Sequence, residues 1–296
     1  MTRRPSRSAS RTATPTAAIG VIGGSGLYAM ESIRGLREVR VRTPFGPPSD
    51  AYLVGELGGL RVAFLSRHGR GHRLMPSEIN YRANLFGLKQ LGVQRVISVS
   101  AVGSMKESLH PGQVVVPDQF IDVTKQRVST FLGRGVVGHV GFGDPVCAEL
   151  ASLLAEAGRR VGATVHPRGT YVCIEGPQFS TRAESQLYRS WGVDIIGMTN
   201  ATEAKLAREA QLCYATIALI TDYDCWHQTA EAVTVEAILH LLHQNAELAK
   251  RLIADVVPKI PTVRRCPCRS SLRDAIVTAP KAQTAGVRRL LALLQR

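Results

Sequence analysis

Ile19-Gly-Val-Ile-Gly-Gly-Ser-Gly-Leu27 is an apolar run that leads straight into three glycines around Ser25. It predicts a buried strand followed by a turn whose backbone N–H groups converge. Such a nest binds an anion, and the Ser25 hydroxyl adds a donor. The glycines do not fit the G-x-G-x-x-G spacing of dinucleotide sites. A tight turn that only packs against the sheet explains them equally well.

Similar runs rich in Val and Ile alternate with longer amphipathic stretches from residue 18 to about 257. The alternation is typical of an α/β fold, so we expect a single domain with a central mixed, mostly parallel β-sheet flanked by helices. The expected strands are Ala18–Ile22, Val62–Leu65, Val96–Ala101, Gln113–Asp118, Tyr171–Ile174, Ile195–Met198 and Tyr214–Thr221. The expected helices are Asn80–Leu91, Ala148–Gly158, Thr181–Trp191, Glu203–Ala210, Val233–Val256 and a short one at Leu290–Leu294.

Anion-binding residue types follow two further strands. Arg67 and His68 come after Val62–Leu65, where a guanidinium fork can hold two anion oxygens and an imidazole can add a donor. Ser100 and Ala101 end the next strand and offer hydroxyl and backbone donors. Ligands of parallel sheets bind at strand carboxyl ends, so we expect these groups to meet around one anion. A solvated basic loop is the alternative for 66–72.

Two carboxylates, Asp222 and Asp224, end the strand Tyr214–Thr221. Alternation along an extended chain puts both on one side, so one can face a substrate while the other orients it. Partial burial beside Tyr223 and Trp226 would raise a carboxyl pKa, which favours a proton donor. An Asx turn is the common alternative for a single Asp.

Phe179 lies among small residues in Glu175-Gly-Pro-Gln-Phe-Ser-Thr-Arg-Ala-Glu184. The ring could stack on a flat ligand, although a core position is the more frequent fate of a Phe. Glu184 stands in the first turn of the following expected helix, which predicts a capping or ion-pair role.

The net charge of +14 is concentrated at the two ends of the chain. Residues 1–17 carry +4, residues 258–296 carry +8, and the body between them carries only +2. We expect a disordered basic tail over 1–17, although a transit peptide has similar composition, a catalytic domain over 18–260 and a basic arm over 261–296. The nearly neutral body makes nucleic acid an improbable partner.

The apolar runs are too short for a membrane-spanning helix, and residues 1–17 contain no apolar signal core. We therefore expect a cytoplasmic protein without a membrane partner. Six cysteines are too sparse for a secreted disulfide framework. Cys266-Pro-Cys268 has no second Cys or His pair beside it at ligand spacing, so we expect no metal; a strained bridge or redox role for this pair remains an alternative.

Nine motifs occur in an order that resembles the 5′-methylthioadenosine phosphorylases of the trimeric purine nucleoside phosphorylase superfamily. They are GGSGLY, TPFGPPSDA, SRHGRGH, PSEINYRAN, SAVGS, PGQVVVPDQFID, EGPQFSTRAES, IIGMTN and TDYDCW, over about residues 18–260. The resemblance implies the nucleoside phosphorylase fold, a homotrimer or homohexamer, and no cofactor, with inorganic phosphate as co-substrate.

The resemblance also implies roles for individual residues. Phosphate would be held by Ser25, Arg67, His68, Ser100, Ala101 and Thr199. The nucleoside would contact Met198 under the ribose, Phe179 beside the purine, Asp222 and Asp224 at the base, Val235 at the 5′ group, and His139 from a neighbouring subunit. Asp222 is implied to be the catalytic acid.

The implied reaction is phosphorolysis of 5′-methylthioadenosine to adenine and 5-methylthioribose 1-phosphate. An Asp at 222 suits the amino group of adenine, whereas relatives that prefer 6-oxopurines commonly carry Asn there. Gly197 and Asn200-Ala-Thr202 depart from the family pattern and could shift base or sugar preference. A purine nucleoside phosphorylase acting on inosine or guanosine, or on a broad range of purine nucleosides, is the alternative.

Overall fold

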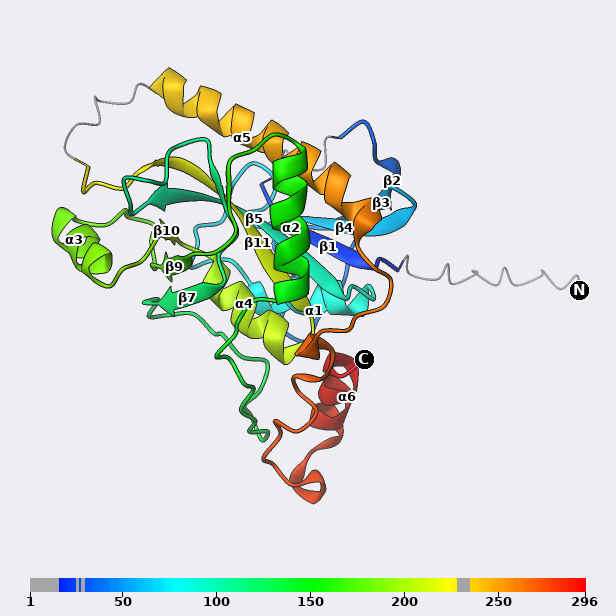
Figure 1. Ribbon diagram of the computed structural model, residues 1–296. Coiled ribbons are helices and arrows are strands. Elements are labelled where there is room, and N and C mark those ends of the chain that lie inside the picture. The colour runs from blue at the N-terminus through cyan, green and yellow to red at the C-terminus, as the bar shows by residue number, and fades with distance from the viewer. Residues whose placement is uncertain (1–15, 25–26, 28–29, 228–234) are drawn as a thin grey trace, which may run out of the picture.

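The sheet of this protein is mixed and mostly parallel (Figure 1). The computed structural model describes residues 16–24, 27, 30–227 and 235–296. In the described part, β1 to β11 form one sheet, in which six of the ten strand pairings are parallel. The strands are β1 Ile19–Gly23, β2 Arg34–Val39, β3 Tyr52–Leu57, β4 Leu60–Ser66, β5 Arg95–Ser104, β6 Val114–Val115, β7 Gln119–Asp122, β8 Val165–His166, β9 Thr170–Cys173, β10 Ile195–Gly197 and β11 Cys213–Tyr223. The expected sheet type is therefore confirmed.

The centre of the sheet is β1, whose five residues are all buried. It runs parallel to β4 on one side and to β5 on the other, and β5 continues parallel to β11. Gly20 lets β1 approach a helix closely, because an added Cβ would lie 3.1 Å from Leu88. These four strands correspond to expected strands and bring their carboxyl ends to one edge.

Helices cover both faces of the sheet. They are α1 Tyr81–Gln90, α2 Ala148–Arg160, α3 Arg182–Ser190, α4 Asn200–Glu209, α5 Val235–Val256 and α6 Ala285–Leu294. One buried cluster joins β1, β5 and β11 to α2 and α5, and a second joins the opposite face to α1, α4 and α6. In Figure 1, α2 crosses in front of the strands while α1 and α4 lie behind them. The chain thus forms three layers.

The structure confirms one expected helix cap and changes the bounds of two expected elements. Thr181 and Glu184 form a reciprocal capping box at the start of α3, which confirms the capping role of Glu184. Helix α4 begins at Asn200 rather than at Glu203, because the turn after β10 leads directly into it. The expected strand Gln113–Asp118 is reduced to β6.

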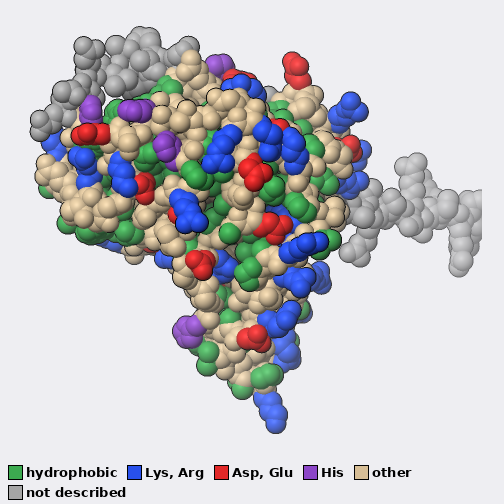
Figure 2. All heavy atoms as spheres, in the orientation of Figure 1, with side chains coloured by type: hydrophobic (Ala, Val, Ile, Leu, Met, Phe, Trp, Pro, Cys, Tyr) green, Lys and Arg blue, Asp and Glu red, His purple; other side chains and the backbone are tan. Residues whose placement is uncertain are grey.

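A protrusion extends from the body and combines the loop 133–143 with residues 262–296 (Figure 1). Gly138 pairs with Ile276, and the N–H of Val277 bonds the Val137 carbonyl at 2.9 Å. Figure 2 shows Lys and Arg side chains gathered along one side of this protrusion. Leu272, Leu291 and Leu294 are buried in the second core, so residues 262–296 pack onto the body.

At the amino end, the expected tail is described only at Thr16 and Ala17; residues 1–15 lie outside the described part. Ala17 is buried and its N–H bonds the Leu91 carbonyl at 2.8 Å. None of the helices in the described ranges is both long and apolar enough to span a membrane.

Cys266 and Cys268 have a second pair of thiols beside them in space, although no such pair stands near them in the sequence. Cys147 and Cys213, distant in sequence, lie with them in a group whose sulfur atoms are all within 4.8 Å of one another. Sequence spacing could not show this, because long-range strand and helix packing brings the second pair into place.

Candidate active site

The carboxyl ends of β4, β1 and β5 meet at one edge of the sheet. Gly23 pairs with Ser66, and the N–H of Arg67 bonds the Gly23 carbonyl at 2.9 Å. Ile22 pairs with Ser98 on the other side, inside β5, so the residues that follow β1 and β4 gather beside the middle of β5. The expected convergence is therefore present for 23–24, 66–68 and 98–101. Ser25 lies outside the described residues.

Arg67 is buried at this edge, and its guanidinium fork is already engaged. Its Nε donates to Glu203 Oε1 at 2.6 Å, while Nη2 donates to Glu203 Oε2 at 3.2 Å and to Ser98 Oγ at 2.6 Å. Nη1 donates to the Val99 carbonyl at 2.8 Å. Four of its five N–H groups are thus bonded inside the protein. The fork is therefore held mainly by Glu203 and Ser98, and one N–H of Nη1 is left over for an anion.

Glu203 is the residue that determines this arrangement, and sequence reasoning missed its role. It is 1% exposed and also accepts hydrogen bonds from Ser98 Oγ at 2.9 Å and Tyr214 OH at 2.8 Å. Burial alone would lower the pKa of Arg67, but the Glu203 carboxylate outweighs it and raises that pKa. The available signal was an acid next to Ala204 at the start of the expected helix Glu203–Ala210.

His68 is held by a backbone carbonyl and by a second imidazole. Its Nδ1 lies 2.7 Å from the Leu74 carbonyl, and its ring stacks on His72 with centroids 4.2 Å apart. Because a carbonyl only accepts, Nδ1 carries the proton and Nε2 of the neutral ring is an acceptor. Burial lowers the pKa of His68 to about 4. The expected donor is therefore an acceptor at neutral pH.

Ser100, Ala101 and Thr199 lie around the same edge. Ser100 is 7% exposed, whereas Ala101 is exposed. Thr199 is buried at the N-cap of α4, but its hydroxyl bonds Asn200 Oδ1 at 3.1 Å instead of capping the helix. Asn200 in turn donates to Ser98 Oγ at 3.1 Å, which sets the start of α4 beside the middle of β5. A helix N-terminus at this position favours a negative charge.

Asp222 and Asp224 lie at the end of β11, beside β5. Asp222 pairs with Gly103 after an irregularity in register between Ile220 and Asp222. A Cβ added to Gly103 would lie 3.2 Å from Asp222 Oδ1 and 3.6 Å from Asp224 Cβ. Both aspartates therefore face Gly103 from one side, which confirms the expected juxtaposition.

The two carboxyl groups have different surroundings. Asp222 keeps an exposed surface, yet the protein around its carboxyl raises its pKa by desolvation. A 2.6 Å hydrogen bond from Thr221 opposes the shift and the charge of Asp224 adds to it. Asp224 is buried, and its N–H bonds the Ser104 carbonyl at 3.2 Å. Asp222 is thus the more accessible group.

Arg127 connects the expected nucleoside residues and was not anticipated from sequence. Its side chain is buried and bonds Glu175 Oε1 at 3.1 Å, the Glu175 carbonyl at 2.7 Å and the Met198 carbonyl. Met198 also packs closely on Gly176, where an added Cβ would lie 2.5 Å from its sulfur. Arg127 therefore fixes Met198 against the loop after β9.

The remaining expected residues lie apart from this core of contacts. Phe179 is 83% exposed, so it is no core residue. Val235 is the first residue of α5, but its side chain is outside the described part. His139 is exposed on the protrusion, where its N–H bonds the Ala275 carbonyl at 2.8 Å.

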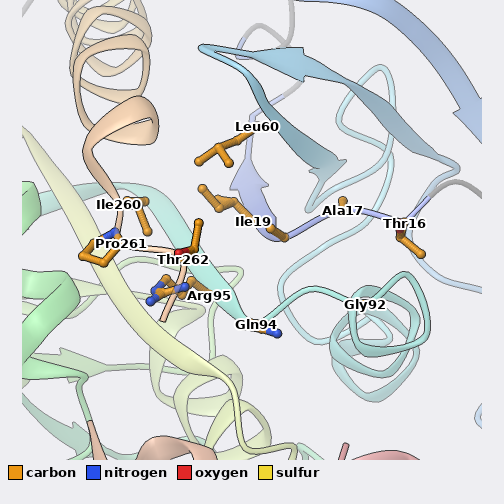
Figure 3. A pocket seen from close by; sticks show the side chains of 11 residues that line it. Thr16, Ala17, Ile19, Leu60, Gly92, Gln94, Arg95, Ile260, Pro261 and Thr262 are labelled. Carbon is orange, nitrogen blue, oxygen red and sulfur yellow. The ribbon is translucent and has the colours of Figure 1, made fainter. Parts of the chain in front are cut away.

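A cavity of about 240 Å³ lies elsewhere, at the amino ends of β1 and β5 (Figure 3). It is lined by Ile19, Leu60, Arg95 and Ile260 among others. Since the aspartates and Arg67 lie at the carboxyl ends, this cavity is not the candidate active site.

Comparison with known proteins gives one consistent result. The chain is 58% identical to the S-methyl-5′-thioadenosine phosphorylase of Koribacter versatilis, over 94% of this chain and 95% of that protein. It is also 58% identical to the enzyme of the same name from Geobacter sulfurreducens, over 93% and 97% of the two chains. The crystal structure of a methylthioadenosine phosphorylase from an Antarctic soil metagenomic library superimposes with a TM-score of 0.91 at 51% identity, covering 94% and 99% of the chains. The model of the phosphorylase superfamily matches residues 18–258, and this chain therefore belongs to that superfamily.

Proposed function

We propose that this protein catalyses the phosphorolysis of 5′-methylthioadenosine to adenine and 5-methylthioribose 1-phosphate. The observation that carries the proposal is the pair Asp222 and Asp224, which faces Gly103 near the carboxyl ends of β5 and β11. The relatives with that named activity cover almost the whole chain.

In this reaction a phosphate oxygen bonds to C1′ of the sugar as the C1′–N9 bond breaks. The electron pair of that bond passes to the purine, while positive charge builds on the ribose. Phosphate supplies the nucleophile, so no side chain needs to attack. Holding phosphate below C1′ can lower the barrier by roughly 7–11 kcal/mol.

Asp222 is the proposed acid that protonates the departing adenine at N7. Its raised pKa favours the protonated form that a donor requires. Asp224, buried beside it, would disfavour ionisation of its neighbour and orient the contact with the amino group.

The proposed anion site consists of Ser25, Ser100, Ala101, Thr199 and His68. His68 Nε2 would accept the proton of hydrogenphosphate, since Nδ1 already donates to Leu74. Arg67 contributes its remaining Nη1 N–H group and its positive charge. Met198 would lie under the ribose, and Phe179 and Val235 would line the purine and 5′ ends.

We also propose that the enzyme is a homotrimer or homohexamer in which His139 reaches a neighbouring site. Phe179, Leu187 and Trp191 leave large apolar surfaces exposed along 179–191. Exposed side chains of this kind are typical of an interface. Light scattering on the purified protein tests this, and a monomer at working concentration would refute it.

A side-by-side assay tests the function. Purified protein with phosphate is given methylthioadenosine, adenosine, inosine or guanosine, and free base is measured. We expect methylthioadenosine to give the highest kcat/KM and to release no adenine without phosphate. Rapid cleavage of inosine with none of methylthioadenosine would instead indicate the purine nucleoside phosphorylase, which Asp222 and the named relatives do not favour.

A further inference from the structure

Four of the six cysteines form a compact group on the side of the sheet away from the aspartates. The group is Cys147, Cys213, Cys266 and Cys268, with all four sulfur atoms within 4.8 Å of one another. Cys213 Sγ lies 3.2 Å from Cys266 Sγ. Three of these side chains are buried and Cys266 is partly buried. Chemical reactivity, including metal binding, rather than packing usually decides whether a Cys is retained.

Three separate segments supply the thiols. Cys147 is the N-cap of α2, and its N–H bonds the Tyr214 carbonyl at 2.9 Å. Cys213 is the first residue of β11, and its N–H bonds the Gln94 carbonyl at 3.0 Å. Cys266 and Cys268 flank Pro267 at the start of the segment that leads to the protrusion. The backbone therefore holds the first two sulfurs firmly, and the third segment completes the set.

The spacing of the sulfurs suits a tetrahedral ion. Zinc binds thiolate sulfur at about 2.3 Å, which places the four sulfurs of a tetrahedron roughly 3.8 Å apart. Here one pair is 3.2 Å apart and no pair is more than 4.8 Å apart, which is compatible with that value. Four sulfur ligands select zinc over harder ions such as magnesium or calcium.

The surroundings favour negative charge on these sulfurs. Arg208 Nη1 lies 3.9 Å from Cys268 Sγ, and its guanidinium is buried beside the group. The N-terminus of α2 points its dipole at Cys147. A site with four thiolates and one Zn²⁺ carries a net charge of −2, which Arg208 partly offsets.

We propose that Cys147, Cys213, Cys266 and Cys268 bind one structural Zn²⁺ ion. Each thiol that binds releases its proton to solvent, so metal affinity falls as the pH is lowered. With four protein ligands there is no open position, and the ion joins residues 262–296 to α2 and β11 rather than taking part in the reaction.

Metal analysis of the full chain tests the proposal. The protein is purified without a polyhistidine tag, with a reductant and without a chelator. We expect about one zinc per chain in the wild type, and a loss to background in the double variant Cys266→Ser/Cys268→Ser. Cys225→Ser, an exposed thiol outside the group, is the matched control and should keep its zinc. Zinc retained by the double variant would refute the assigned ligands.

Cobalt substitution gives a readout that does not depend on a variant folding. Wild-type protein in which Co²⁺ replaces Zn²⁺ should show the visible absorption of a tetrahedral tetrathiolate, and thiol titration should show four groups that react only after chelation. A chain without zinc, whether its thiols are free or joined as disulfides on mass analysis, overturns the proposal.

Discussion

The two ends of β11 share one strand but have opposite properties. Its first residue, Cys213, lies in the closed group of four thiols, while Asp222, next to its last residue, is open to solvent on one side. Between them, Tyr214 and Thr216 join the buried network around Glu203 and Asn200. The amino end of β11 is thus buried, whereas its carboxyl end is accessible to solvent. This is expected for parallel sheets, which bind ligands at the carboxyl ends of their strands.

The largest effect should come from Asp222→Asn at the open end. Asn preserves size but cannot donate a proton as an acid, so kcat should fall about 10²–10⁴-fold. The raised pKa means that ionised Asp222 costs stability at neutral pH, so the variant should unfold no more easily than wild type. Steady-state kinetics and thermal unfolding measure the two quantities.

Glu156→Gln is the control for Asp222→Asn, since Glu156 is a surface acid on α2 away from the site. It should retain both activity and stability. A parallel loss of stability and activity in Asp222→Asn would give Asp222 a structural role instead and would erase the contrast between the two ends of β11.

The buried network between the two ends of β11 is tested by Glu203→Gln, because Glu203 of α4 accepts a hydrogen bond from Tyr214 of β11. This change leaves the Arg67 charge buried without its partner, and breaking such a pair typically costs about 3–5 kcal/mol. The free energy of unfolding from urea titration measures it. Glu38→Gln, which breaks the exposed pair with Arg70, is the control and should cost little. Equal effects would mean that the buried network does not stabilise the centre of the sheet.

A smaller effect should appear in the pH dependence of stability. His68 has its pKa lowered to about 4 from a usual 6.5, so between these values the unfolded chain binds a proton that the folded chain does not. Folded stability should therefore fall as the pH drops through this window, by roughly 1 kcal/mol per pH unit, and should be unaffected by His68 above it. His68→Gln should flatten this part of the curve. Identical slopes for variant and wild type would contradict the burial of a neutral ring.

The smallest effect concerns Gly103, the residue of β5 that the two aspartates face. Gly103→Ala adds a Cβ 3.2 Å from Asp222 and 3.0 Å from Ile196, so kcat should fall several-fold and stability by about 1 kcal/mol. Gly286→Ala in α6, whose added Cβ has no neighbour closer than 3.8 Å, should instead be neutral or stabilising. Full activity of Gly103→Ala would show that Asp222 can shift without cost.

The sequence predicted the centre of the fold well because its strands are short and apolar and lead into Gly, Ser, Arg, His or Asp residues. β1, β4, β5 and β11 were all expected, and the strand-end motifs do meet. β2 was missed because its residues are mostly exposed and charged, so it carries no apolar signal. β3 and β4 form a hairpin across Gly58-Gly59, both with positive φ, a turn signal that the sequence contained and that was overlooked.

The candidate site was predicted in its residue types but not in its pairings. Arg67 was expected to face an anion, yet Glu203, 136 positions later, takes up its fork. Arg127 and the four thiols were missed for the same reason: their partners come from distant segments that only the packed sheet brings together. Local spacing carries no information about such contacts. A charged residue among small apolar residues, however, indicates that a buried partner of opposite charge is needed.

The carbonyl of Leu74 has a consequence for which anions this edge would accept. By fixing the proton on Nδ1 of His68, it leaves Nε2 with a lone pair that can only accept a hydrogen bond in the neutral ring. Hydrogenphosphate has an O–H to offer that lone pair, but sulfate has none at neutral pH, so the two similarly shaped ions would meet attraction and repulsion respectively. The Leu74 carbonyl oxygen, which takes no part in the reaction, would thus make the site prefer hydrogenphosphate over sulfate.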